Sequence, residues 1–138
     1  MTVYLDSSAL VKLLVREKET TAIRAYVAAR PSWASSILAS VEVMRAVQRR
    51  APDRLAEMED ALSGMTVIAC DRRIALAAGR VPPPSLHSLD AIHLASALEL
   101  GSDLEAVVTY DDRLADAARA LGLPVVAPGA NEQASIGP

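Results

Sequence analysis

The sequence predicts a single α/β domain in which helices cover both faces of a central parallel sheet. Short β-branched runs alternate with helical segments of about 10–15 residues, a pattern typical of strand–helix–strand units. Three of the apolar runs end on an aspartate, at Asp6, Asp71 and Asp111. Neighbouring parallel strands place their carboxyl ends at one edge of the sheet, where open α/β folds bind ligands. We therefore expect several carboxylates to converge at that edge.

Length and composition agree with one compact domain. A chain of 138 residues is large enough for one domain to bury most of its apolar surface. Apolar residues make up 51% of the chain and Phe is absent, so the core is expected to be aliphatic. The aperiodic Gly, Asn, Gln and Ser at the C-terminus predict a domain over residues 1–128 and a flexible tail over 129–138.

Charge and hydropathy exclude several classes of protein. A net charge of −3 argues against nonspecific coating of nucleic acid, which needs a basic surface. It does not exclude a nuclease, because bound cations offset acidic ligands. No apolar run approaches the ~18 residues of a membrane span, and no export signal is expected. We therefore expect no membrane contact. The single Cys70 can form no internal disulfide, which agrees with a cytoplasmic protein.

The N-terminal half is expected to contain strand 2–5, a helix from Ser7 or Ser8 to about residue 17, helix 21–30, strand 33–36, helix 38–50 and helix 55–62. The serine hydroxyls can cap the first helix by accepting bonds from unpaired backbone N–H groups. Pro31 ends the second helix, and Pro52 opens the last. Apolar side chains recur at helical spacing in the first helix and in helix 38–50.

The C-terminal half is expected to contain strand 65–70, helix 74–78, an extended loop at 81–84, helix 89–100, strand 106–110, helix 114–121 and strand 125–126. Asp71 and Ser88 are the predicted caps of the first two helices. Consecutive prolines exclude a helix from the loop. Gly101 and Gly122 are expected to end the two longer helices.

Four carboxylates occupy positions that favour an anion. Asp6 and Asp111 follow strands, while Glu42 and Asp90 lie early in helices, where the helix dipole is favourable. Their oxygens suit Mg²⁺ or Mn²⁺, and two His and one Cys in no ligand spacing argue against zinc. Such a site supports attack of a metal-activated water on a phosphodiester. One ion or two could take part.

Each of these residues also has a simpler interpretation. Asp71 is expected to be a helix cap only, and Asp112 can cap the helix that begins near residue 114 while Asp111 points into the crevice. Glu42 alone is more typical of a solvated helix residue. His93, one turn after Asp90, is more typical of polar packing than of a metal ligand.

Four blocks of sequence resemble PIN-domain proteins, specifically the VapC-like ribonuclease toxins of bacterial toxin–antitoxin modules. In chain order the blocks are YLDSSALVKL at 4–13, SSILASVEVMRA at 35–46, HSLDAIHLASAL at 87–98 and VVTYDDRL at 107–114. The resemblance extends from residue 2 to about residue 128. It implies a PIN-like α/β/α sandwich and a Mg²⁺-dependent endoribonuclease.

The resemblance also implies roles for individual residues. Asp6, Glu42 and Asp90 match the first three acidic residues of the family, with Asp6 and Asp90 as the principal metal ligands. Asp111 takes the fourth position, which Asp112 could share or replace.

Ser7 and Thr109 are then expected to orient these carboxylates. The partners that the resemblance implies are an RNA substrate, a cognate antitoxin that covers the acidic groove, and a second copy of the chain in a homodimer.

Arginines offer candidate contacts to RNA. Arg45 and Arg49 lie on the helix that carries Glu42, within reach of phosphates that flank a scissile bond. Further candidates are Arg72, Arg73, Arg80 and Arg113. Each of these arginines, Arg45 and Arg49 included, is more typical of a solvated residue or of a partner for a nearby Asp or Glu. Three Tyr, one Trp and no Phe leave little capacity for base stacking, so RNA shape and backbone should dominate recognition.

Two alternative functions remain open at this point. A phosphatase could use Asp6 as a nucleophile, but haloacid-dehalogenase-like enzymes need a second Asp two residues on, where this chain has Ser8. A receiver domain would need an acidic pair near the first strand. A catalytically silent PIN-like scaffold would have lost one of the first three acids, and all three are present.

Overall fold

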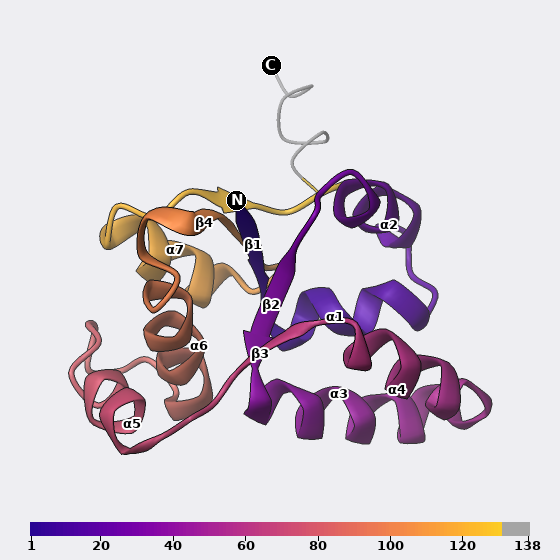
Figure 1. Cartoon of the computed structure of the whole chain (residues 1–138), viewed down its shortest axis with the longest axis horizontal. Helices are drawn as coiled ribbons and strands as arrows, with labels where there is room; N and C mark the ends of the chain where they lie inside the picture. The colour runs from indigo at the N-terminus through magenta and orange to yellow at the C-terminus, as the bar shows by residue number, and fades with distance from the viewer. Residues whose placement is uncertain (131–138) are drawn as a thin grey trace.

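The fold is a parallel five-stranded sheet between two layers of helices (Figure 1). The computed structural model describes residues 1–130. The strands lie in the order β3-β2-β1-β4-β5, and all neighbours are parallel. Their bounds are β1 Thr2–Leu5, β2 Trp33–Ser36, β3 Thr66–Ile68, β4 Leu104–Val108 and β5 Val125–Val126. The predicted single α/β/α sandwich is confirmed.

Seven α-helices connect and flank these strands within the described residues. They are α1 Ser7–Leu14, α2 Thr20–Ala28, α3 Ile37–Arg50, α4 Leu55–Ser63, α5 Arg72–Ala78, α6 Ser88–Leu98 and α7 Asp112–Ala120. Short 3₁₀ turns occupy Pro52–Arg54 and Gly101–Asp103. None of the helices within 1–130 is both long and apolar enough to cross a bilayer.

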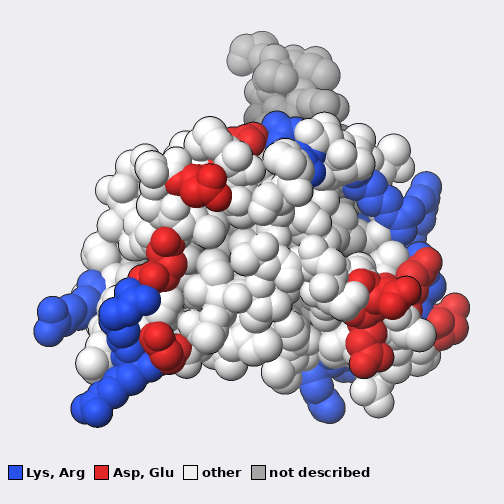
Figure 2. All heavy atoms as spheres, viewed as in Figure 1, with Lys and Arg blue, Asp and Glu red and all other residues white. Residues whose placement is uncertain are grey.

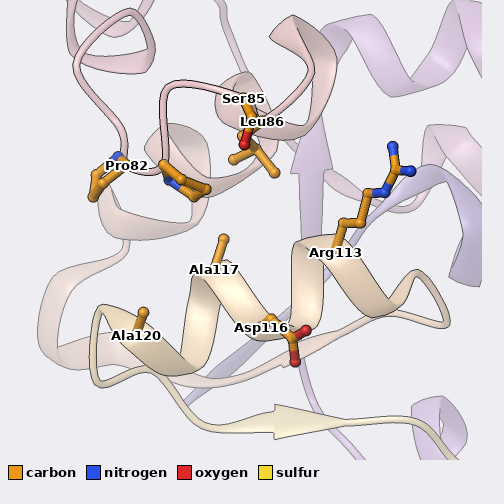
Figure 3. A pocket seen from close by; sticks show the side chains of 8 residues that line it. Pro82, Ser85, Leu86, Arg113, Asp116, Ala117 and Ala120 are labelled. Carbon is orange, nitrogen blue, oxygen red and sulfur yellow. The ribbon is translucent and has the colours of Figure 1, made fainter.

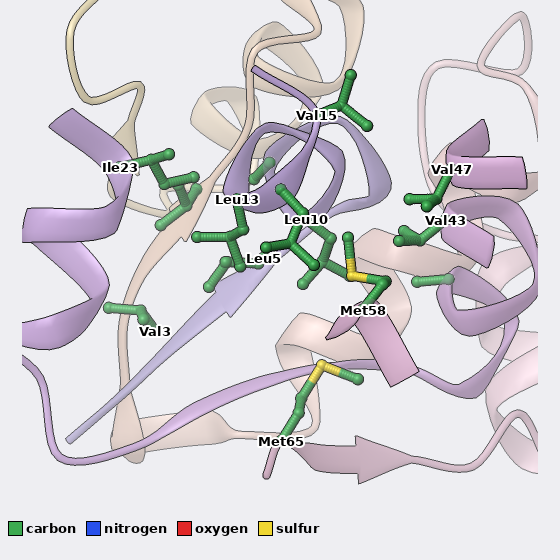
Figure 4. Packing of buried hydrophobic residues seen from close by; sticks show 14 residues of the cluster. Val3, Leu5, Leu10, Leu13, Val15, Ile23, Val43, Val47, Met58 and Met65 are labelled. Carbon is green, nitrogen blue, oxygen red and sulfur yellow. The ribbon is translucent and has the colours of Figure 1, made fainter. Parts of the chain in front are cut away.

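Alternation along the central strand β1 divides the core into two layers. Successive side chains of a strand point to opposite faces. Val3 and Leu5 pack with residues of α1, α2, α3 and α4 in one aliphatic cluster (Figure 4). Tyr4 points to the other face, where it packs with Ala97 of α6. Both faces of β1 are therefore buried, as expected for a parallel sheet.

The register of the central strands positions the end of the sheet. Leu5 of β1 is opposite Val108 of β4, and the Asp6 backbone N–H donates to the Val108 carbonyl at 3.2 Å. Asp6 and Thr109, the first residues after the two strands, therefore lie side by side. On the other flank β2 ends at Ser36 and leads directly into α3.

Two predicted helix caps were wrong. Asp6, and not Ser7 or Ser8, caps α1, because its extended backbone lets the carboxylate accept the Ala9 N–H at 2.9 Å. The helix α6 begins at Ser88 itself, and the preceding His87 makes no side-chain capping bond.

Element ends differ from the predictions by a few residues. The helix α1 stops at Leu14 instead of about residue 17, and Val15 is already extended. The freed Leu13 carbonyl accepts a bond from Arg24 Nε at 2.7 Å. Gly122 follows α7 as predicted, with a φ of 79° that other residues rarely adopt. The domain boundary at residue 128 stays a prediction, and most of the predicted tail, 131–138, lies outside the described residues.

Candidate active site

Asp6 lies at the carboxyl end of β1, in the middle of the sheet. Its side chain is nearly inaccessible, since the residue is 3% exposed. Oδ1 accepts from the Ser8 hydroxyl at 2.7 Å and from the Ala9 N–H at 2.9 Å, and Oδ2 accepts from Thr109 Oγ1 at 2.5 Å. Burial raises the pKa of Asp6, and the bonds from Thr109, Ser8 and Ala9 oppose that rise.

Thr109 connects two of the predicted acidic residues. Its hydroxyl donates to Asp6 and accepts the Asp111 backbone N–H at 3.0 Å. Thr109 is buried, and these two hydrogen bonds fix the direction of its hydroxyl. The loop after β4 is therefore tied to the end of β1.

Glu42 belongs to α3, on the other side of Asp6. Its Oε1 accepts from Ser7 Oγ at 2.5 Å, and His93 Nε2 lies 3.4 Å from the same oxygen. The bonds from His93 and Ser7 lower the pKa of Glu42 against partial burial. His93 in turn belongs to α6, one helical turn after Asp90, so this contact joins the two helices that carry acidic residues.

Asp90 and Asp111 form the less enclosed part of the site. Partial burial raises the pKa of Asp90, and the charges of Asp111 and Asp6 raise it further. Asp111 caps α7, since Oδ1 accepts from the N–H groups of Arg113 and Leu114 at 2.9 and 3.1 Å. The expectation that Asp112 caps this helix was wrong: Asp112 is its exposed first residue.

These contacts bring the four predicted acids to one edge of the sheet. Besides burial, the charges of Asp111 and Asp6 raise the pKa of Asp90, and His93, which lies 3.4 Å from Glu42 Oε1, acts to lower the pKa of both Asp6 and Asp90. No three carboxylate, His or Cys side chains within residues 1–130 are gathered closely enough to form a ready three-ligand metal cluster. Mg²⁺ fits such an arrangement, because it keeps several waters and commonly uses one or two carboxylates together with substrate phosphates.

Asp71 lies apart from this group. It follows the edge strand β3, is exposed, and caps α5 by accepting the Ile74 N–H at 2.9 Å. The interpretation of Asp71 as a helix cap is confirmed.

A groove leads away from the acidic edge along α1 and α3. It encloses about 460 Å³, and the residues that line it include Ser7, Lys12, Glu42, Arg49 and Arg50. Two of its cations are engaged: Lys12 contacts a pair of glutamates, and Arg50 contacts one of them at 3.1 Å. Arg49 makes no ion pair with any residue of 1–130 and is exposed.

Other predicted arginine contacts lie outside the groove. Arg45 is exposed on α3 but does not line it. Arg73 forms a paired contact with Glu99. On the face shown in Figure 2, charged side chains of the described residues gather at the margins and the middle carries none. No broad basic patch is present on that face of residues 1–130, in agreement with the net charge of −3.

A second hollow, of about 740 Å³, opens between the proline-rich loop and α7 (Figure 3). Pro82 and Leu86 form one wall, and Arg113, Asp116 and Ala117 form the other. None of the four acids lines it, so it is distinct from the acidic edge.

His93 and Tyr4 contribute to this edge of the sheet in a way that the sequence did not predict. Both ring nitrogens of His93 have partners, since Tyr4 OH lies 2.7 Å from Nδ1. The spacing of three residues between Asp90 and His93 placed both on one side of a helix and was the available signal. Tyr4 carried no signal, because a tyrosine within a buried strand is ordinary core.

Comparison with known proteins identifies the family. Residues 3–120 match the PIN domain, and the chain belongs to the PIN-domain family. Within it, the chain is similar to ribonuclease VapC46 of Mycobacterium tuberculosis, at 47% identity over 91% of this chain and 97% of the relative. Ribonuclease VapC35 of the same species is 44% identical over 92% of this chain and 97% of the relative. The predicted resemblance to VapC toxins is confirmed.

Solved structures agree with this assignment. A toxin–antitoxin complex from Klebsiella pneumoniae contains a chain with a TM-score of 0.71 and 26% identity, over 91% of this chain and 97% of that one. The VapC20 toxin of M. tuberculosis, which cleaves the sarcin–ricin loop, has a TM-score of 0.72 at 18% identity, over 91% and 99% of the two chains. The latter similarity shows the fold.

Proposed function

We propose that this chain is a Mg²⁺-dependent endoribonuclease and the toxin of a toxin–antitoxin module. The observation that carries the proposal is the meeting of Asp6, Glu42, Asp90 and Asp111 at one edge of a PIN-domain sheet. The charges of Asp111 and Asp6 disfavour the ionised form of Asp90, and a bound cation would offset that repulsion. The VapC relatives carry the name ribonuclease, which supports RNA as the substrate.

In this proposal Asp6 and Asp90 hold the divalent ion, with Mn²⁺ as an alternative to Mg²⁺. The ion, when bound, would activate the attacking water and stabilise charge on the phosphate. Thr109 keeps Asp6 oriented and favours its ionised form, since its bond opposes the effect of burial on the pKa. Asp111 has one oxygen engaged as a helix cap and offers the other to the site.

The groove beside Glu42 is the proposed path of the RNA strand. Arg49 lies two helical turns after Glu42 and therefore on the same side of α3. Its guanidinium is the one we assign to a phosphate next to the scissile bond, because Lys12 and Arg50 are already paired with glutamates. Arg45 lies one turn after Glu42 but does not line the groove, so its contact with RNA would lie outside the groove.

The proposed partners are an antitoxin and a second copy of the chain. The similarity to a chain of a toxin–antitoxin complex supports the antitoxin. Exposed apolar side chains on α3, Ile37 at 43% and Val41 at 61%, support contact with another protein surface. Because bacterial RNA is found in the cytoplasm, we expect a ribonuclease of this kind to act there.

Expression in a bacterium without the antitoxin tests this function. The wild-type chain should arrest growth, and Asp90→Ala should relieve the arrest while accumulating to the same level. Sequencing of RNA 5′ ends after a brief pulse should show new ends with the wild type alone. Equal arrest by both forms, or identical RNA ends, would contradict the proposal.

A further inference from the structure

A buried chain of hydrogen bonds runs from the backbone of β2 to the carboxylate of Glu42. The Ser36 N–H donates to Tyr4 OH at 3.2 Å, and Tyr4 OH lies 2.7 Å from His93 Nδ1. His93 Nε2 lies 3.2 Å from Ser7 Oγ and 3.4 Å from Glu42 Oε1. This series of hydrogen bonds thus connects the sheet, through α6, to α3.

The direction of these bonds follows from the donors available. Tyr4 is 0% exposed, and its phenolic hydroxyl carries one proton that it can donate. The Ser35 and Ser96 hydroxyls make no hydrogen bond within residues 1–130. The partners of His93 Nε2 give the direction: the Glu42 carboxylate only accepts, and Ser7 Oγ has given its proton to Glu42 Oε1, so Nε2 faces two acceptors. The Nδ1 atom of the neutral ring then accepts from the Tyr4 hydroxyl, which itself accepts from the Ser36 N–H.

Because Nδ1 accepts a hydrogen bond, the ring proton of neutral His93 lies on Nε2. The Nε2–H then faces Glu42 Oε1 and Ser7 Oγ, while Ser7 donates its own proton to the same Oε1 at 2.5 Å. Oε1 is therefore approached by two protein donors. Glu42 Oε2 makes no hydrogen bond with the described residues and remains for the reacting groups.

We propose that Tyr4 and His93 are positioning residues. Tyr4 holds His93 in its Nε2–H tautomer, and His93 in turn orients Glu42 so that Oε2 is directed toward the RNA-cleaving site. The inference rests on the proposed ribonuclease function for its consequence, although the tautomer itself does not. His93 is 4% exposed. It lies on α6 one turn after Asp90 and contacts Glu42 of α3. It therefore also fixes the spacing between the helices that carry Glu42 and Asp90.

The tautomer can be read directly by long-range ¹H–¹⁵N correlation on histidine-labelled protein. The chain has two histidines, and exposed His87 serves as the internal reference. His93 should show a bare Nδ1 and a protonated Nε2, and Tyr4→Phe should shift His93 toward a mixture of tautomers. Tyr26→Phe, on α2, should leave the His93 signals unchanged. A protonated Nδ1 with a bare Nε2 in the wild type would overturn the proposal.

Two matched variants test the consequence for catalysis. A glutamine amide reaches the position of Nε2 and can still donate to Glu42, whereas an asparagine amide reaches only the position of Nδ1. His93→Asn should lower kcat about 10–100-fold with little change in KM, and His93→Gln should recover most of that loss. Equal kcat for the two variants would overturn the positioning role. A locked tautomer in a wild-type chain that cuts no RNA would instead reject the ribonuclease function and leave the tautomer assignment standing.

Discussion

Asp6 and Asp71 have the same local structure and differ in almost everything else. Each follows a parallel strand and caps the next helix, with φ and ψ of −80° and −179° at Asp6 and −82° and −178° at Asp71. Each carboxylate accepts the N–H of the third residue on at 2.9 Å. Their backbone conformations alone give no sign of different roles.

Their places in the sheet separate them. Asp6 ends the central strand, is buried, and receives two further bonds, from Ser8 and Thr109. Asp71 follows the edge strand, is exposed, and makes its one side-chain bond within residues 1–130 to the Ile74 N–H. An aspartate between a strand and a helix can thus cap the helix at either place in the sheet. It becomes part of a candidate active site only where neighbouring elements bring other acidic residues close to it.

The strongest way to break this comparison is to neutralise each aspartate in turn. Asparagine caps helices as well as aspartate does, so both variants should fold. Asp6→Asn should lower the rate of RNA cleavage by about 10³-fold or more, since a cation ligand contributes several kcal/mol to catalysis. Asp71→Asn should stay within about twofold of the wild type, measured with a fluorogenic RNA. Equal losses would show that capping, and not the site, accounts for the effect.

Removing the hydroxyl that only Asp6 receives sharpens the contrast. Thr109→Val keeps the shape of the side chain but removes the bond to Asp6 Oδ2. Loss of a group that orients a metal ligand typically costs about 10–100-fold in activity, and Thr109→Ser should recover most of it. Thr66→Val, an exposed change on the edge strand, is the matched control. Activity of Thr109→Val at the wild-type level would contradict the role of this bond.

The Asp6→Asn substitution should increase the stability of the fold although it lowers activity. Burial raises the pKa of Asp6 in the folded state, so its contribution to stability is present below the unfolded pKa and is lost as pH rises through the folded value. Asp6→Asn should therefore raise Tm at pH 7 by on the order of a few degrees, and the gain should vanish near pH 4. Thermal melts of both proteins in EDTA across this range check the prediction. A lower Tm for Asp6→Asn at pH 7 would contradict it.

The smallest expected effect concerns the groove beside the site. Arg49→Ala should raise KM for RNA about threefold. It should also lower the slope of log affinity against log salt concentration by about the value expected for one phosphate contact. Arg50→Ala should change KM less, because Arg50 is paired with Glu17. Cleavage rates at several salt concentrations distinguish them. A larger effect at Arg50 would reassign the RNA contact.

Much of this fold could be predicted from sequence because the signals are local. Alternating β-branched runs and helical stripes predicted the order of strands and helices. Gly122 marked the end of α7, whereas α2 ends at Ala28, two residues before the end predicted from Pro31. The caps of α1 and α6 were wrong because several adjacent polar residues compete for a cap. Which of them wins depends on the backbone angle at the end of the strand, as at Asp6 and His87.

The contacts of the site depend on long-range packing that the sequence does not display. Thr109 meets Asp6 through the register of β4 against β1. His93 meets Glu42 only because α6 and α3 approach the same end of the sheet from opposite layers. The separation of Asp71 from the acidic group likewise follows from strand order, which places β3 at the edge.

Metal-dependent cleavage of RNA by the purified chain tests the central claim most directly. The protein, freed of antitoxin and treated with EDTA, is mixed with a structured RNA before and after Mg²⁺ is restored. We predict no cleavage in EDTA, full cleavage once Mg²⁺ is added, and none by Asp6→Asn under either condition. Cleavage that persists in EDTA, with the same products and the same rate, would contradict the account.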